Sequence, residues 1–284
     1  MTVFGLAISP SAAPGADPAG DARHAEELGF GFVSTSDHPC GTSPTNEVWT
    51  MLTWIAATTS RIGIATRVLG MPYRAPAMVA KMAETLDRLS GGRLILGLGG
   101  GSADDEFRAF GLGVPSPRDK VDGMTDGIRI IQGLWSERSF SHDGRIHHTD
   151  RADIEPKPAR RIPVWLGTYG PRALAATGRL ADGWIPSYGY APPERIPAMR
   201  DRILRAAEAA GRDPSELTLA YNVPVRIGGH AHRGTVTGPA SAVTERLREL
   251  LGLGFTALNL TPTGPDPREQ AEQLARDVLP ALRG

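Results

Sequence analysis

Short apolar runs alternate with longer amphipathic stretches along almost all of the 284 residues. The runs are rich in Val, Ile and Leu and end at Gly, Pro, Ser or Thr, which is typical of buried strands. They predict strands at Val3–Ser9, Phe32–Asp37, Ile62–Val68, Leu94–Gly99, Pro163–Thr168, Gly183–Ser187, Leu217–Ile227 and Ala257–Pro262. The stretches between and after them predict helices at Ala19–Leu28, Asn46–Ala57, Pro76–Leu89, Arg118–Leu134, Arg172–Leu180, Pro193–Ala210, Ser241–Leu251 and Pro267–Arg283.

Eight strands, each followed by a helix, predict an α/β fold of the (β/α)8 TIM-barrel type. A doubly wound open sheet is the alternative, but such a sheet has fewer strands and often a second domain. No linker divides this chain, so residues 1–284 are expected to form a single domain. The insertion between the fourth and fifth strands, residues 101–162, should hold the fourth helix and a hairpin at the barrel rim, since Asp143-Gly144 is a hairpin signal.

Charge and composition exclude several classes of partner. Lys plus Arg and Asp plus Glu both number 31, which gives no reason to expect nucleic acid or a membrane surface. Cys40 is the sole cysteine, so an internal disulfide is impossible. No run approaches the length of a membrane-spanning helix, and the first residues lack a signal-peptide pattern. We therefore expect a cytoplasmic protein that acts on a small molecule.

In a barrel of this type, function lies at the carboxyl ends of the strands. The second strand ends in "STSDHP", which places Asp37 and His38 at the barrel mouth. A histidine there can exchange a proton near neutral pH, although the pair could also simply cap the turn before Pro39. The third strand ends in "IATRVLG", and an isolated Arg67 at such a position is more often a surface or ion-pair residue than a ligand contact.

The fourth strand runs into "LGLGGGSADDE". Its spacing does not match a dinucleotide fingerprint, because Ser102 stands where the last glycine or alanine is required. Three consecutive residues, Gly99, Gly100 and Gly101, expose backbone N–H groups that could bind a ligand. Alternatively, the glycines relieve crowding at a tight corner.

The fifth strand ends in Gly167, Thr168, Tyr169 and Gly170, and a helix follows. Free N–H groups, the helix dipole and the Thr168 hydroxyl predict an anion site with Arg172 close by. An ordinary turn is the alternative.

Other chemistries find less support. The histidines of two loops, His142, His147, His148, His230 and His232, lack the spacing of metal ligands, so no metal site is predicted. No lysine stands at a strand end for Schiff-base chemistry, and no G-x-S-x-G motif is present for a serine hydrolase.

Four segments in order carry a resemblance to a known family: "AEELGFGFVSTSDH", "RIGIATRVLGMPYRAPAMVAKMAETLDRLSGGRLILGLGGG", "IPVWLGTYGPRALAATGRLADGW" and "LGFTALNL". Over nearly its whole length the chain resembles the luciferase-like monooxygenase superfamily, and within it the branch that uses coenzyme F420. The resemblance implies a TIM barrel with a deazaflavin across its mouth, and a homodimer.

The resemblance also implies roles for individual residues. A non-proline cis peptide at Arg67–Val68 would support the middle of the ring, and the N–H groups of residues 99–102 would meet the ring edge or side chain. The turn from Gly167 to Arg172 would bind the phosphate of the cofactor tail. Asp37 and His38 would lie near the reactive carbon, with His38 as proton donor or acceptor.

The implied activity is an F420-dependent oxidoreductase that transfers a hydride between the deazaflavin and a small organic carbonyl, alcohol or activated alkene. The sugar-phosphate dehydrogenase branch has an acidic residue where this chain has Ser102, which argues against sugar-phosphate oxidation. A monooxygenase that uses reduced FMN is the alternative, and a non-catalytic flavin-binding protein is a further one. Variable loops at residues 39–46, 139–148 and 228–238 are expected to form the substrate pocket.

Overall fold

The computed structural model describes residues 2–230 and 232–283. Eight parallel strands form a closed barrel, which confirms the predicted fold: each strand pairs with the next, and the last pairs with the first from Ala257 opposite Val3. The barrel strands are β1 (Val3–Ala7), β2 (Phe32–Thr35), β3 (Gly63–Thr66), β5 (Leu94–Gly99), β8 (Val164–Leu166), β9 (Gly183–Trp184), β10 (Thr218–Ile227) and β12 (Ala257–Pro262).

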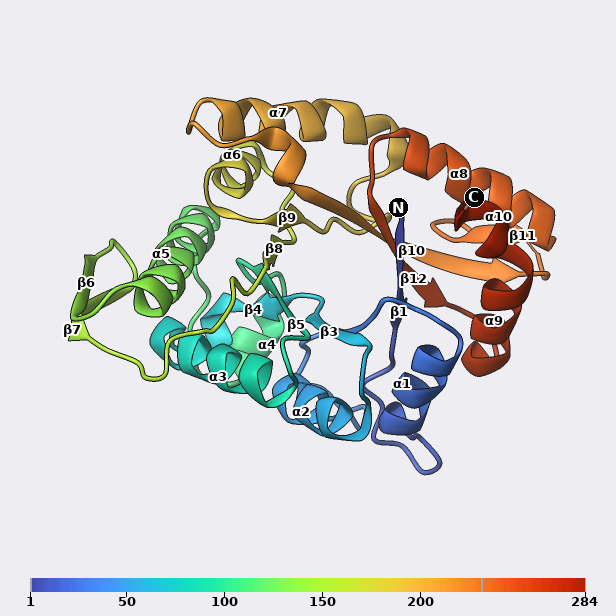
Figure 1. The fold of residues 1–284 in the computed structure, drawn as a ribbon, viewed down its shortest axis with the longest axis horizontal. Helices are drawn as coiled ribbons and strands as arrows, with labels where there is room; N and C mark the ends of the chain where they lie inside the picture. The colour runs from blue at the N-terminus through green and yellow to red at the C-terminus, as the bar shows by residue number, and fades with distance from the viewer. Residues whose placement is uncertain (1, 231, 284) are drawn as a thin grey trace.

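Helices form an outer layer around the strands (Figure 1). They are α1 (Pro18–Glu27), α2 (Val48–Thr58), α3 (Pro76–Leu89), α5 (Pro117–Ser136), α6 (Pro171–Leu180), α7 (Ile196–Glu208) and α8 (Ala240–Gly252). The predicted final helix is interrupted: α9 (Pro267–Gln273) and α10 (Pro280–Arg283) flank a π-helical turn, Leu274–Val278. Pro280 has no N–H to continue an α-helical ladder, and Leu279 N–H instead bonds the Leu274 carbonyl at 2.9 Å. None of the helices in the described part of the chain is both long and apolar enough to cross a membrane.

Several predicted strands extend too far at their carboxyl ends. Residues 36–37, 67–68 and 185–187 lie beyond β2, β3 and β9, although the sequence included them in strands. Most of these residues line a cavity at the mouth of the barrel. The apolar pattern did not mark where the backbone leaves the sheet, because residues beyond the strands, such as Asp37 after β2 and Ile185 after β9, remain buried.

The bore of the barrel is filled in layers. Phe32, Ala65, Trp165, Ile185, Ala220 and Ala257 form a buried apolar cluster. Two residues further along their strands, Ser34, Asn259 and Asn222 form a hydrogen-bonded chain, with donor–acceptor distances of 3.0 and 2.8 Å. Because the interior is packed, a ligand can enter the barrel only from the carboxyl ends of the strands, as far as this polar layer.

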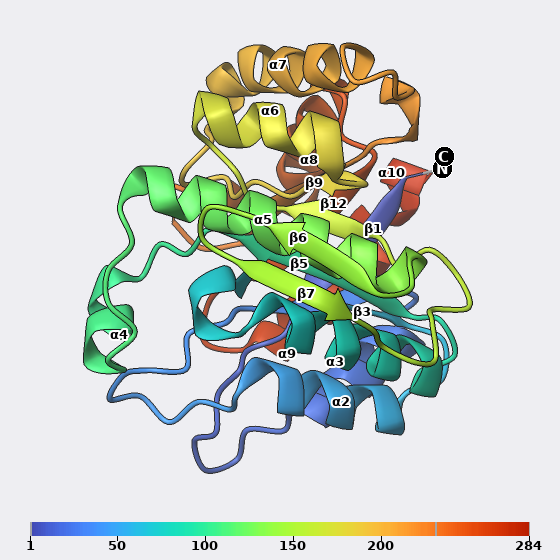
Figure 2. The same cartoon turned by 90° about the vertical axis from the view of Figure 1, so that its left-hand side faces the viewer.

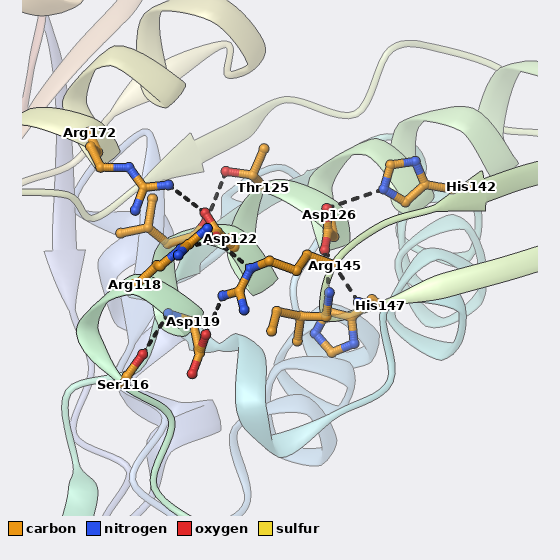
Figure 3. A network of polar contacts seen from close by, with 12 residues as sticks. Ser116, Arg118, Asp119, Asp122, Thr125, Asp126, His142, Arg145, His147 and Arg172 are labelled. Carbon is orange, nitrogen blue, oxygen red and sulfur yellow. Dashed lines mark hydrogen bonds and ion pairs between the residues drawn. The ribbon is translucent and has the colours of Figure 1, made fainter.

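The hairpin of the insertion is present, with β6 (Phe140–Asp143) antiparallel to β7 (His148–Ala152). It lies outside α5, as Figure 2 shows, while the short helix α4 (Asp104–Ala109) lies at one end of the molecule. Asp126 of α5 holds the hairpin by accepting hydrogen bonds from the N–H groups of Ile146 and His147 and by pairing with His142 (Figure 3).

Candidate active site

A cavity of about 350 Å³ opens at the carboxyl ends of the barrel strands. The expected cofactor and catalytic residues that line it are Asp37, His38, Arg67, Val68, Gly99, Gly100, Gly101, Ser102, Gly167 and Tyr169. The three loops expected to shape a substrate pocket contribute none of the described lining residues. The hairpin is fastened to α5, where Asp126 accepts hydrogen bonds from the N–H groups of Ile146 and His147.

Three residues of the predicted anion turn are not among the residues that line the cavity. The Thr168 hydroxyl is buried and shares a 2.7 Å hydrogen bond with Thr177, so it does not face the cavity. Arg172 is 60% exposed and donates to Asp122 at 2.6 Å (Figure 3). Gly170 caps α6 without a side-chain hydrogen bond. Any anion held at this turn would therefore depend on backbone N–H groups and the helix dipole.

Asp37 is fully engaged by partners within the protein. Its carboxylate has no exposed surface, accepts 2.8 and 3.1 Å hydrogen bonds from Arg74, and accepts a 2.9 Å bond from Gly70 N–H. Arg74 also pairs with Glu47, which caps α2. Asp37 therefore has a structural role, because these bonds fix the segment after β3 against the end of β2.

His38 stands at the outer side of the cavity, with its side chain 54% exposed. Its Nδ1 lies 2.7 Å from Oε1 of Glu106, and Oε2 of the same carboxylate accepts a 2.7 Å hydrogen bond from the Tyr73 hydroxyl. Burial, together with the bond to Glu106, raises the pKa of Tyr73 well above its usual range, so Tyr73 remains a donor. The His38 imidazole is thus oriented by the Glu106 carboxylate, which is in turn oriented by the Tyr73 hydroxyl.

Glu106 and Tyr73 were missed from sequence. Residues 104–106 looked only like acids beginning a helix, and they do begin α4 with all three in its first turn. The spacing of Glu106 from Ser102 carried no signal either, because Ser102 and Ala103 precede α4 and helical periodicity does not extend to them. Tyr73 carried no such signal in the sequence.

The glycines face Val68, in the segment that follows β3, as well as the cavity. A Cβ on Gly99 would lie 2.7 Å from Val68, and one on Gly167 would lie 3.2 Å from it. The peptide bond between Arg67 and Val68 is cis, as the resemblance implied. Gly99 at the end of β5 and Gly167 just after β8 therefore make room for the Val68 side chain, which lines the cavity.

Beyond β5 the backbone also presents free donors. The N–H groups of Gly101 and Ser102 bond to no described residue, and both residues line the cavity. Gly101 has φ +86°, and a Cβ there would lie 2.5 Å from Phe107, so glycine is required at this position. These N–H groups provide neutral donors for a polar or anionic group of a ligand.

Comparison with known proteins identifies the family. The model for luciferase-like monooxygenases matches residues 19–233, most of the chain. The chain belongs to this family. As a luciferase-like family member it is an oxidoreductase, and its barrel and cis peptide agree with the resemblance drawn from the sequence.

Individual relatives can be named. An F420-dependent glucose-6-phosphate dehydrogenase of Amycolatopsis mediterranei is 31% identical over 310 residues, covering 92% of this chain and 93% of that relative. An F420-dependent hydroxymycolic acid dehydrogenase of Mycobacterium tuberculosis is 33% identical over 204 residues, or 69% and 55% of the two chains. A solved structure of an F420-dependent secondary alcohol dehydrogenase with an F420-acetone adduct shares the fold, with TM-score 0.90 and 19% identity over 100% and 99% of the chains.

Proposed function

We propose that this luciferase-like protein is an F420-dependent oxidoreductase that interconverts a small organic alcohol and its carbonyl, or reduces an activated alkene. Relatives at about 30% identity are named as F420-dependent dehydrogenases. The observation that carries the proposal is His38, the only histidine among the described residues of the cavity lining, held there by Glu106. Alcohol oxidation and carbonyl reduction both require a group that moves a proton at the reacting oxygen.

The residues present fit a deazaflavin. The cavity is lined by Val68, by glycines and by Tyr169 and Tyr190, which offer apolar and aromatic surface suited to a flat ring. The unpaired N–H groups of Gly101 and Ser102 and the start of α6 suit the polar, phosphorylated tail. When bound, the cofactor would supply the hydride chemistry, while the protein orients the substrate and handles the proton.

His38 is arranged to exchange that proton through one nitrogen. Nδ1 is engaged by Glu106, so Nε2 is the ring nitrogen left for a substrate oxygen. The carboxylate fixes the orientation of the ring, and Tyr73 fixes the carboxylate. Glu106 is thus a positioning residue. It also places a carboxylate beside the cavity, although Ser102 stands where the sugar-phosphate dehydrogenase branch has an acidic residue.

A Glu106→Gln variant should test this positioning role. We expect kcat to fall about tenfold or more, equivalent to ~1.4 kcal/mol of activation free energy, because the amide weakens the hold on His38. The dissociation constant for F420 should stay within about twofold of wild type. Steady-state kinetics and fluorescence titration measure the two quantities.

Asp105→Asn provides the matched control, since the Asp105 side chain is 98% exposed and its one ion pair with a described residue is with Arg108. It should match wild type in both measurements. Equal kcat in wild type and Glu106→Gln would show that His38 needs no carboxylate partner.

Equilibrium titration with oxidised and reduced F420 and FMN tests the cofactor assignment. Ring fluorescence should report binding of F420 at least tenfold tighter than binding of FMN, and alcohols or carbonyls should be turned over by the F420-loaded protein. Preferential binding of reduced FMN with oxygen uptake would establish the monooxygenase alternative instead. Tight F420 binding without turnover of any alcohol, carbonyl or alkene would indicate a binding protein.

A further inference from the structure

Arg67 brings a positive charge into the cavity that the protein does not neutralise. The residue follows β3 and lines the cavity, and its Nε is buried without a hydrogen-bond partner. No carboxylate between residues 2 and 283, residue 231 aside, forms an ion pair with it. Arg67 as a whole is partly exposed, but its buried Nε lacks a partner, and a partly buried guanidinium without an ion pair is unfavourable in a folded protein.

The polar groups nearby do not supply the missing charge. Asp37 is neutralised by Arg74, and Glu106 is engaged by His38 and Tyr73. Tyr169 is the titratable neighbour of Arg67, and its ionised form would stabilise the guanidinium. Burial raises the pKa of this phenol, however, so Tyr169 remains neutral at physiological pH. Arginine stays protonated even where burial lowers its pKa, so the charge persists.

We propose that Arg67 is the anion-binding residue of the cavity and pairs with a flat, delocalised negative charge on the ligand. This proposal rests on the proposed function. The anion that pairs with the guanidinium can come from either of two ligands. One is the deazaflavin ring, whose ionised hydroxyl spreads its charge over the ring; the other is a substrate carboxylate. A guanidinium is planar and donates paired N–H bonds, which matches the edge of either group.

The first arm of the test concerns the ring. Wild type, Arg67→Met and Arg67→Lys are loaded with F420, and ring ionisation is followed by absorbance across pH. If the ring supplies the anion, the apparent ring pKa in wild type lies at least one unit below that in Arg67→Met. Arg67→Lys retains the charge and should recover most of the difference, which a packing role for Arg67 would not produce.

The second arm uses ligand-free protein and needs no cofactor. Calorimetry compares benzoate with benzamide, which have similar shape but differ in charge. If a substrate carboxylate is the partner, wild type prefers benzoate at least tenfold and Arg67→Met loses the preference. The melting temperature of ligand-free Arg67→Met should be no lower than that of wild type, since the variant removes an unpaired charge.

Each outcome either supports or overturns the proposed role of Arg67. An effect of Arg67→Met in either arm supports the proposal and identifies the source of the anion. Unchanged ring ionisation together with no preference for benzoate overturns it, and Arg67 is then a packing residue. If wild type fails to bind F420, the proposed function fails, while the benzoate arm still decides the role of Arg67.

Discussion

His38→Ala is expected to lower turnover by about 10²- to 10⁴-fold, the usual contribution of a positioned acid–base group. His38 carries the only imidazole among the described residues that line the cavity, and its Nδ1 lies 2.7 Å from Oε1 of Glu106. F420 affinity should change little, because the suggested contacts to the ring and tail come from Val68 and backbone N–H groups on other strands. The effect should therefore appear in kcat.

Kinetics and fluorescence titration on the same preparations separate these two effects. His230→Ala is the matched control, since it removes an exposed imidazole outside the cavity and should behave as wild type. His38→Gln keeps a hydrogen-bonding group beside Glu106 but cannot exchange a proton near neutral pH, so it should be as slow as the alanine variant. A turnover within threefold of wild type in His38→Ala would remove His38 from the proton step.

The barrel could be predicted because its strands are buried on both faces and so appear as uninterrupted apolar runs. Two of the eight, Leu94–Gly99 and Ala257–Pro262, have the predicted bounds. The end of β2 was less accurate for a physical reason: Asp37 is buried by its bonds to Arg74 and Gly70, and a short apolar pattern does not distinguish a buried loop from a strand.

The site could be predicted only where it is local in sequence. Asp37-His38 and the glycines follow their strands directly, so the barrel alone brings them to one end. Glu106 lies 68 residues from His38, and Tyr73 lies 33 residues from Glu106, so no spacing rule connects the three residues. Thr168 and Arg172 show that closeness in sequence does not decide what a side chain binds. Both belong to the predicted turn, and in the structure their side chains bond to Thr177 and Asp122.

Gly97→Ala is expected to destabilise the protein by about 3 kcal/mol or more, at the upper end of the cost of overpacking. An added Cβ would lie 1.9 Å from the Thr66 carbonyl oxygen, a backbone atom that cannot rotate away. The Thr66 hydroxyl also donates a 2.7 Å hydrogen bond to the Gly97 carbonyl, so β3 and β5 are fastened at this contact. Moving β3 would also shift Arg67 and Val68 beside the cavity, and F420 affinity should fall with stability.

Thermal unfolding followed by circular dichroism measures the change, which corresponds to a melting temperature lower by about 6–12 °C. Gly252→Ala is the matched control, because it lies at the end of α8 with no atom within 4 Å of its added Cβ. It should melt at or slightly above the wild-type temperature, since alanine loses less backbone entropy on folding. A Gly97→Ala protein that melts within about 2 °C of wild type and binds F420 equally well would show that β3 can shift freely, and the close β3–β5 contact would then not be what holds the cavity wall in place.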